Sequence, residues 1–127
     1  MAAQRLKNTN KSNGLRLVGY VRVSTEDQAR EGVSLVAQRR RLSAYATAHG
    51  AELVAVKADE GISGKVPPAK RPGLSAALAR VRSGEADGLL VLKLDRLSRT
   101  TRDVLDLADE SGRRGWRLVV LTGRRRR

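Results

Sequence analysis

Four short runs of apolar residues recur along the chain, each bounded by polar or glycine-rich segments. Runs of this length without strict alternation are typical of strands that are buried on both faces of a parallel sheet. We therefore expect at least four strands, at Leu15–Val23, Ala51–Val56, Gly88–Leu94 and Arg117–Thr122.

Between these runs, apolar residues recur at the three- and four-residue spacing of amphipathic helices. Ser34 precedes the first helix as a cap, Pro72 begins the second, Gly84 ends it, and the third closes near Gly112 and Gly115. The alternating order predicts an α/β fold, with a mainly parallel sheet of at least four strands and helices on both faces. The predicted core-facing residues are Leu35, Leu42 and Ala46; Leu74, Leu78 and Val81; and Val104, Leu107 and Ala108.

Polar residues follow two of the predicted strands. Ser24 and Thr25 come at the end of the first strand, and the third runs into Asp95 and Arg96. In open sheets of this class, ligands gather beyond the carboxyl ends of the strands, where the strand order reverses. If the first and third strands are neighbours, a hydroxyl, a carboxylate and guanidinium groups converge there.

Basic residues outnumber acidic ones, with 26 Lys and Arg against 13 Asp and Glu and a net charge of +13. This balance favours a polyanionic partner, nucleic acid first, because neutralised phosphates release their counterions. Residues 1–14 are polar and basic without apolar periodicity, so we expect a flexible leader. Residues 15–123 then form one modest domain. The arginine tail, Arg124, Arg125, Arg126 and Arg127, is expected to touch DNA phosphates.

Several classes of protein do not fit this composition. The chain has no cysteine and a single histidine, His49, so we expect no disulfide, no thiolate metal site and no Ser-His-Asp triad. No segment approaches the ~18–20 apolar residues of a membrane span, and no signal peptide is apparent. We expect a cytoplasmic protein without a membrane partner, a metal or a small-molecule cofactor. His49 reads as a helix-end residue without a function.

Two short motifs carry candidate chemistry. Arg22 and Ser24 are two positions apart at a strand end, so their side chains point the same way. Alone, this pair also fits a turn serine beside a solvent-facing arginine. Arg96 and Arg99 are three positions apart, which places both on one side of a helical turn, where two guanidiniums can grip one phosphate. The alternative is a solvated Asp95-Arg96 pair, although Asp95 directly follows an apolar strand.

Together these segments resemble the catalytic domain of the serine recombinases, a family that includes resolvases, invertases and large serine integrases. The pattern YxRVSTxxQ begins at Tyr20 and the pattern LDRLxR begins at Leu94. The resemblance runs from about residue 15 to residue 122 and includes the segments DEGISG from Asp59 and KRPGL from Lys70. It implies a resolvase-like catalytic fold.

The resemblance also implies a reaction. The Ser24 hydroxyl would attack a phosphodiester of double-stranded DNA and form a 5′-phosphoserine link, without ATP or a metal. Asp95 would steer Arg96 or take part in proton transfer. The residues that would hold or polarise the phosphate are Arg22, Arg71, Arg96 and Arg99, and the supporting residues are Gln28, Gln38 and Asp59. Without the resemblance, Arg71 and Gln38 would read as surface residues and Asp59 as a loop cap.

The resemblance breaks off at the carboxyl end of the sequence. Members of that family continue into a long helix that forms dimers and crosses DNA, and then into a DNA-binding domain; here Gly123 is followed by the arginine tail, as a shifted reading frame would also give. The complete family architecture implies dimers or tetramers on nucleoid DNA in a bacterial or phage setting. We expect residues 1–127 to recombine DNA poorly by themselves.

Two further readings stay open at this point. One is a non-catalytic remnant that binds DNA or another subunit. The other is a receiver-like phosphoacceptor domain that uses Asp59 or Asp95. The receiver-like reading would need paired acids at the end of the first strand, and that place holds Arg22 and Ser24 instead.

Overall fold

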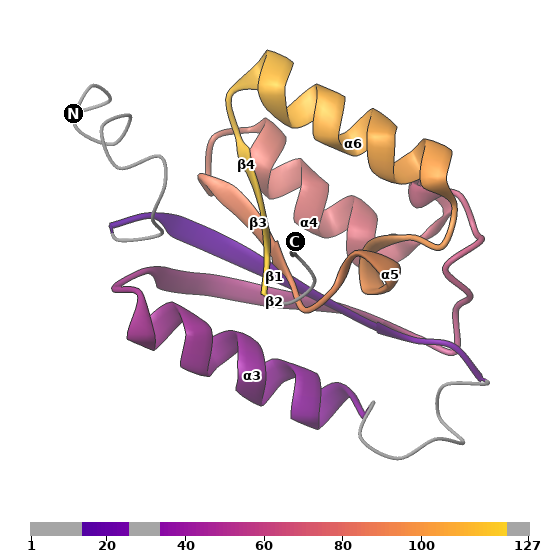
Figure 1. Ribbon diagram of the computed structural model, residues 1–127, viewed down its shortest axis with the longest axis horizontal. Coiled ribbons are helices and arrows are strands. Elements are labelled where there is room, and N and C mark those ends of the chain that lie inside the picture. Colours follow the sequence, from indigo (N-terminus) through magenta and orange to yellow (C-terminus); the bar gives the residue numbers. More distant parts are fainter. Residues whose placement is uncertain (1–13, 26–33, 122–127) are drawn as a thin grey trace, which may run out of the picture.

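Four parallel strands form the central sheet of the computed structural model, which describes residues 14–25 and 34–121. The strands lie in the order β2-β1-β3-β4, and all three neighbouring pairs are parallel. The first and third strands are therefore neighbours, and the predicted parallel α/β sheet is confirmed (Figure 1). The strands are β1 (Arg16–Val23), β2 (Glu52–Glu60), β3 (Gly88–Val91) and β4 (Arg117–Val120).

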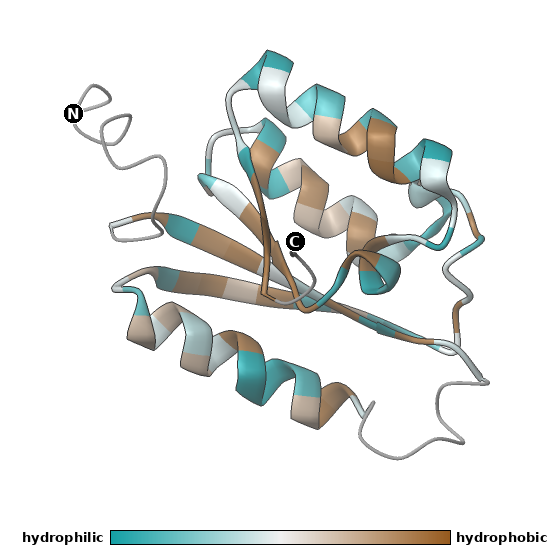
Figure 2. Ribbon diagram, in the orientation of Figure 1, coloured by the Kyte–Doolittle hydropathy of each residue, from teal (hydrophilic) through white to brown (hydrophobic). Residues whose placement is uncertain are grey.

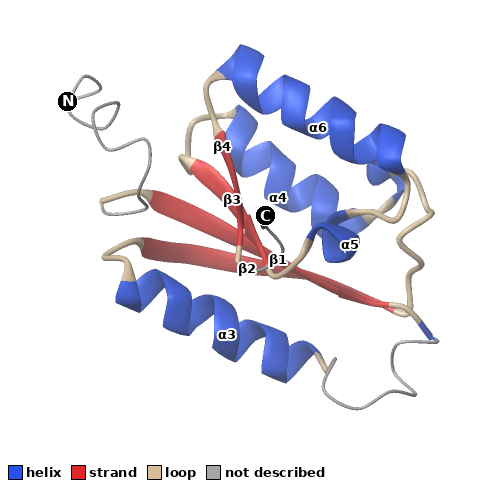
Figure 3. Ribbon diagram, viewed as in Figure 1, coloured by secondary structure: helices blue, strands red, loops and turns tan. Residues whose placement is uncertain are grey.

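Helices cover both faces of the sheet, as the sequence predicts. One helix lies against one face and three lie on the other (Figure 3). The lone helix is α3 (Leu35–Ala48), and the opposite face carries α4 (Pro72–Arg82), α5 (Leu94–Leu97) and α6 (Thr101–Arg114). A short 3-10 turn, η1 (Pro68–Lys70), precedes α4.

The core divides into two halves along β1, because alternate strand residues point to opposite faces of the sheet. Val18 and Tyr20 face α4, α5 and α6, where Leu74 and Leu97 are among the buried residues. Leu17 and Val21 face α3, where they pack with Leu42. Hydrophobic residues, brown in Figure 2, are therefore concentrated on the strands and on the sides of the helices that face them. None of the helices in residues 14–25 and 34–121 has the length and hydropathy of a membrane span.

The helix ends follow the predicted capping residues. The Ser34 hydroxyl accepts a hydrogen bond from the Ala37 N–H at 3.1 Å, which satisfies one of the open donors of the first turn. Pro72 is the first residue of α4, and Gly84 beyond its end has a φ of +87°. Gly115 caps α6 in the left-handed conformation that glycine adopts without strain.

Four details differ from the prediction. Strand β3 ends at Val91, and Leu94, which is 44% exposed, begins the short helix α5 instead of extending the strand. Strand β2 continues to Glu60, Ala108 is exposed on α6, and Gly112 lies within that helix and does not end it. The leader up to residue 13 and the arginine tail lie outside the described residues.

Candidate active site

Strand β1 extends beyond β3 at the carboxyl end of the sheet. It pairs with β2 as far as Val23, but its pairing with β3 ends at Tyr20. Ser24 follows directly and is 8% exposed. Because the strand order reverses between β1 and β3, this end of β1 is the place where ligands gather in open sheets.

A side chain from α3 takes the place of the missing strand beside Arg22. The Gln38 Oε1 accepts a hydrogen bond from the Arg22 main-chain N–H at 3.4 Å, and the Gln38 Nε2 donates to the Arg22 carbonyl at 3.2 Å. A neighbouring strand would satisfy the same two groups. Gln38 is only 1% exposed, so this amide holds the strand end from the α3 side of the sheet.

The guanidinium of Arg22 joins helix α5 to the loop that follows β2. Its Nη2 donates to the Asp95 carbonyl at 2.7 Å, its Nη1 to the Ile62 carbonyl at 2.9 Å, and its Nε to the Arg96 carbonyl at 3.2 Å. The side chain is fully buried. The position of this guanidinium is thus set by three separate main-chain carbonyls.

Arg96 closes the same cluster from helix α5. Its Nη1 donates to the Arg22 carbonyl at 3.4 Å, and its Nε lies 3.8 Å from the Asp95 Oδ1. Arg96 is 5% exposed, whereas the Asp95 side chain is 47% exposed. The Asp95 side chain is partly exposed, but its Oδ1, the oxygen that faces Arg96, is buried and forms no hydrogen bond among the described residues.

A second cluster surrounds the hydroxyl of Tyr20, two residues earlier on the same side of β1. The hydroxyl donates to the Asp59 Oδ2 at 2.7 Å and accepts from the Arg71 Nη1 at 3.3 Å. Burial, together with the hydrogen bond to Asp59, raises the pKa of Tyr20 above its usual value, so its hydroxyl keeps the proton at neutral pH. Tyr20 thus holds Arg71 and Asp59 in a fixed relation.

Asp59 also caps helix α4 from the end of β2. Its Oδ1 accepts from the Gly73 N–H at 2.7 Å and its Oδ2 from the Leu74 N–H at 3.0 Å. The helix N-terminus needs such an acceptor because Arg71, at the cap position, offers no side-chain oxygen. A Cβ at Gly73 would collide with the Ala58 carbonyl oxygen, so glycine permits this close approach of helix and strand.

Arg71 keeps two buried donors without an acceptor. The residue is fully buried, and its Nε and Nη2 have no hydrogen-bond partner among the described residues. Its guanidinium carbon lies 5.9 Å from the centroid of the Tyr20 ring. Buried N–H groups without a partner are costly, and an anion at this point would satisfy them.

A hollow of about 280 Å³ opens beside Ser24. Its wall passes close to Arg22, since a Cβ on Gly64 would lie 3.0 Å from the Arg22 Nη2 and 2.8 Å from the Arg99 Cγ. Only glycine leaves both guanidinium side chains in place. The hollow is lined by Ser24, Thr25, Gly61, Ser63, Gly64 and Arg99.

The prediction that Arg96 and Arg99 share a helical turn is wrong. Helix α5 ends at Leu97, and Ser98 is extended, with φ −164° and ψ 149°. The Gly64 carbonyl accepts both the Arg99 main-chain N–H, at 3.0 Å, and the Ser98 hydroxyl, at 3.1 Å. These bonds hold the chain out of the helix, so Arg96 is buried and Arg99 is exposed at the hollow. Likewise, Asp95 belongs to α5 and does not directly follow the strand.

Comparison with known proteins shows the family to which the chain belongs. The family model described as the N-terminal domain of resolvases matches residues 17–127. The chain belongs to this family. A transposon Tn552 resolvase from Staphylococcus aureus is 40% identical over 98 residues, which cover 77% of this chain and 42% of that protein. An uncharacterised immunity region protein 3 of Bacillus phage phi105 is 41% identical over 78 residues, 61% of this chain and 88% of that protein.

Solved structures give the same assignment of fold. The N-terminal catalytic domain of TP901-1 integrase superposes with a TM-score of 0.75 at 36% identity, covering 84% of this chain and 77% of that one. The resemblance to serine recombinases and the resolvase-like fold are therefore confirmed. This resolvase domain spans less than half the length of the transposon resolvase that it matches.

The structure places the predicted site residues of the resolvase domain in two adjoining clusters along β1. Arg22, Ser24, Gln38, Asp95, Arg96 and Arg99 surround the strand end, and Asp59 and Arg71 meet at Tyr20. Gln28 and the residues Arg124 to Arg127 lie outside the described residues. The Nδ1 of His49 lies 3.0 Å from the Tyr45 main-chain carbonyl, which can only accept, and the imidazole stacks on the Tyr45 ring at the end of α3.

Sequence reasoning missed two residues of this site. Tyr20 lies two positions before Arg22, so the period of a strand could have grouped the two side chains. Gly64 gave no such signal, because its importance comes from contacts with Arg22 and Arg99, which are 42 and 35 positions away in the chain.

Proposed function

We propose that this domain cuts and rejoins DNA strands in site-specific recombination, with Ser24 as the nucleophile. The observation that carries the proposal is the hollow in which Ser24 and Arg99 line one wall while Arg22 lies against its edge. A hydroxyl among fixed guanidiniums suits attack on a phosphodiester, because preorganised cations stabilise the charge that builds on the phosphoryl oxygens.

The proposed cleavage exchanges one ester for another. The Ser24 Oγ bonds to phosphorus, the bond between phosphorus and O3′ breaks, and the proton of the Ser24 hydroxyl is transferred to O3′. The products are a 5′-phosphoserine link and a free 3′-hydroxyl. In the rejoining step the 3′-hydroxyl of the exchanged strand attacks phosphorus and Ser24 leaves with a proton. Each step conserves the ester, so no ATP is required.

The arginines divide this work according to their burial. Arg99 is exposed at the hollow and is placed to contact the phosphate directly. Arg22 and Arg96 are buried beside it and supply fixed positive charge, with Asp95 orienting Arg96. Arg71 is fully buried and does not line the hollow, so it would act on the phosphate through its charge and not through direct contact. Guanidinium suits all of these roles because it stays charged and matches phosphate geometry.

Two further residues act by positioning others. Gln38 holds the main chain of Arg22, and Asp59 fixes both Tyr20 and the start of α4, next to Arg71. We include Gln28 with these supporting residues on the resemblance alone. Recombination by a complete protein, with copies assembled into a dimer or tetramer on double-stranded DNA, is part of this proposal, since the chain matches 42% of the transposon resolvase.

A covalent trapping experiment tests the proposal. The full chain is incubated with random-sequence DNA duplexes in which sulfur replaces the bridging O3′ atoms, which makes the leaving group better. We expect a protein–DNA adduct that survives denaturation, with the nucleotide on the peptide that contains Ser24. Ser24→Ala should reduce the adduct by on the order of 10³-fold or more.

Ser83→Ala is the matched control, because Ser83 is an exposed serine at the far end of α4. That variant should form the adduct at the wild-type level. An adduct that persists in Ser24→Ala would show that another group is the nucleophile. DNA binding without any adduct in the wild type would favour the non-catalytic DNA-binding remnant.

A further inference from the structure

The outer side of α3 carries positive charge that no acidic group of the helix balances. Between Leu35 and Ala48 the helix contains Arg39, Arg40 and Arg41 and no Asp or Glu. All three arginines are exposed. Within residues 14–25 and 34–121, none of their side chains forms a hydrogen bond or an ion pair. We call these three residues the α3 arginine face.

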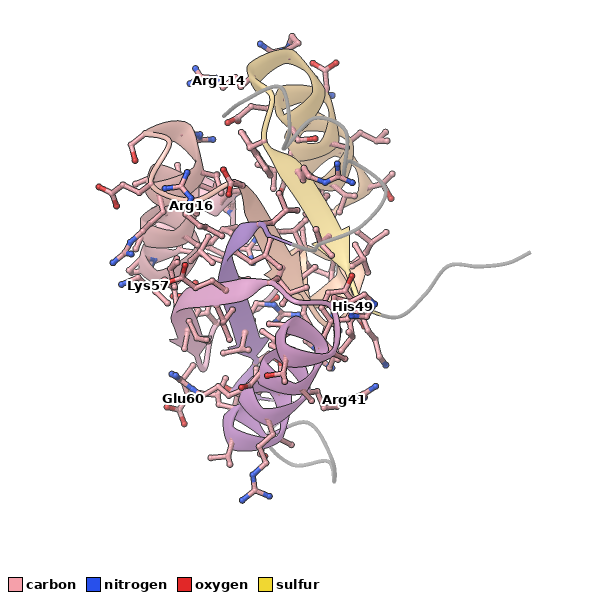
Figure 4. The ribbon with its side chains drawn as sticks, turned by 90° about the vertical axis from the view of Figure 1, so that its left-hand side faces the viewer. Arg16, Arg41, His49, Lys57, Glu60 and Arg114 are labelled. Carbon is pink, nitrogen blue, oxygen red and sulfur yellow. The ribbon has the colours of Figure 1, made fainter. Side chains whose placement is uncertain are left out.

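The opposite side of the sheet shows the reverse pattern. Arginines on α4 and α6 lie beside carboxylates, so much of their charge is balanced locally. Figure 4 shows Arg41 on α3 and Arg114 on α6 at opposite sides of the sheet. The ion pairs are Arg80–Glu85 at 3.6 Å, Arg82–Glu110 at 2.7 Å, Arg113–Asp109 at 2.9 Å and Arg114–Glu110 at 3.9 Å.

The shape of α3 leaves its arginines accessible. The helix meets the sheet along one narrow stripe of buried residues, Gln38, Leu42 and Ala46. Its outward positions beyond the arginines are small, with Ser43, Ala44 and Thr47 all exposed. Small side chains let a partner approach closely. Successive helical residues are about 100° apart, so Arg40 points away from the buried stripe and Arg39 and Arg41 lie on its two flanks, from which their long side chains extend to a partner seated over Arg40.

We propose that the α3 arginine face binds the phosphate backbone of duplex DNA without reading its sequence. Guanidiniums bind phosphates through paired hydrogen bonds, and such contacts position a protein on the duplex. An acidic protein partner would need an apolar anchor as well. On α3 a single large hydrophobic side chain is exposed, that of Val36 at 61%, and one side chain does not form such an anchor. The unpaired cations therefore favour a polyanion.

The place of this surface relates it to the proposed reaction. Gln38, next to Arg39 in the chain, holds the end of β1 that carries Ser24. The residues that line the hollow include none from α3, so the α3 arginine face would be a DNA contact separate from the hollow. The inference rests on the proposed function for the identity of the polyanion, but it does not require Ser24 to react.

The salt dependence of DNA binding tests this inference on the full chain. The variant Arg39→Gln/Arg40→Gln/Arg41→Gln removes three charges and keeps residues of good helix propensity. The control Arg102→Gln/Arg113→Gln/Arg114→Gln removes three charges from the exposed surface of α6. Fluorescence anisotropy with a labelled random-sequence duplex, measured over a series of NaCl concentrations, gives the slope of log K against log salt for each protein.

We expect the α3 variant to reduce that slope by about 2, since each phosphate contact contributes about 0.9. The control should change the slope by less than about half as much, because those arginines are paired or lie on the other face. Equal reductions in the two variants, or no binding of the wild-type chain at low salt, would overturn the inference.

Two additional readouts keep the result interpretable. Circular dichroism checks that both triple variants are folded, and if the α3 variant is not, the three single substitutions are measured and their slope changes summed. Adduct formation is recorded on the same preparations. A slope difference without any wild-type adduct supports the α3 face while contradicting the nucleophile, and an adduct without a slope difference does the opposite.

Discussion

Arginine side chains occupy two contrasting environments in this domain. At the end of β1, Arg22 and Arg71 are fully buried and donate to main-chain carbonyls or to a tyrosine hydroxyl. On α3, the residues Arg39 to Arg41 face solvent. A buried cation acts strongly over a short distance on one group, whereas an exposed cation is screened by salt and adds to a general attraction. The same side chain thus suits either a single phosphate or a whole backbone.

The largest effect should come from removing the buried member of this comparison. Arg22→Gln leaves the carbonyls of Ile62, Asp95 and Arg96 without their donor. We expect the free energy of unfolding to fall by on the order of 3 kcal/mol, because a buried acceptor without a partner costs about 1–3 kcal/mol, and one of these three bonds is buried and two are part-buried. Urea denaturation monitored by circular dichroism measures this change.

Arg40→Gln is the matched control for Arg22→Gln. Its side chain is exposed and has no partner among the described residues, so the unfolding free energy should change by less than about 0.5 kcal/mol. If the two variants are equally stable, Arg22 does not hold helix α5 to the loop after β2. Burial of an arginine would then make no difference to the stability of this domain.

A smaller effect separates two glycines. Gly64→Ala places a methyl group 2.8 Å from the Arg99 Cγ and 3.0 Å from the Arg22 Nη2, so the unfolding free energy should fall by about 1–3 kcal/mol. Gly112→Ala adds its methyl to an open position within α6 and should stabilise the protein by about 0.5–1 kcal/mol. Thermal denaturation of both variants shows whether each substitution raises or lowers the melting temperature. A change in the same direction for both variants would refute the close packing at Gly64.

The smallest expected effect concerns the hydroxyl of Tyr20. Tyr20→Phe removes the group that joins Asp59 and Arg71, at a cost of about 1 kcal/mol near pH 8. Because the pKa of Tyr20 is raised in the folded state, its contribution is complete below pH of about 10, where the unfolded tyrosine keeps its proton, and is lost as the pH rises further.

The stability difference between wild type and Tyr20→Phe should therefore shrink as the pH increases from 8 to 11. Urea midpoints for both proteins across that range measure the difference, and the subtraction removes the contributions of all other titrating groups. A difference that stays constant or grows with pH would mean that the buried hydroxyl is not protected from ionisation.

Much of the fold could be predicted because local signals agree with the tertiary structure. Ser34 and Pro72 mark helix starts, and the apolar runs become the four strands. The end of β3 was misjudged because Leu92 and Leu94 continue its apolar run, although the chain turns into α5 there. An apolar pattern of this length does not distinguish a strand from a helical turn.

The candidate site was predictable only where its residues are close in the chain. Strand periodicity grouped Arg22 with Ser24. The contact between Asp59 and α4 has no local signal, because the cap comes from another strand and the cap position itself holds Arg71. Likewise, the chain leaves the helix and becomes extended at Ser98, where the serine hydroxyl donates to the carbonyl of Gly64, which is distant in the sequence.

The two hydrogen bonds between the Gln38 amide and the main chain of Arg22 connect a helix on one side of the sheet to the residues on the other side. A genetic screen for loss of recombination would be expected to recover Gln38 beside the residues that face the hollow, although its side chain belongs to the opposite layer. Because Gln38 is buried and satisfies two main-chain groups of Arg22, such a mutant would also lose stability. Under the proposed function, the residues whose substitution impairs the reaction would therefore include one on a helix at the other side of the sheet.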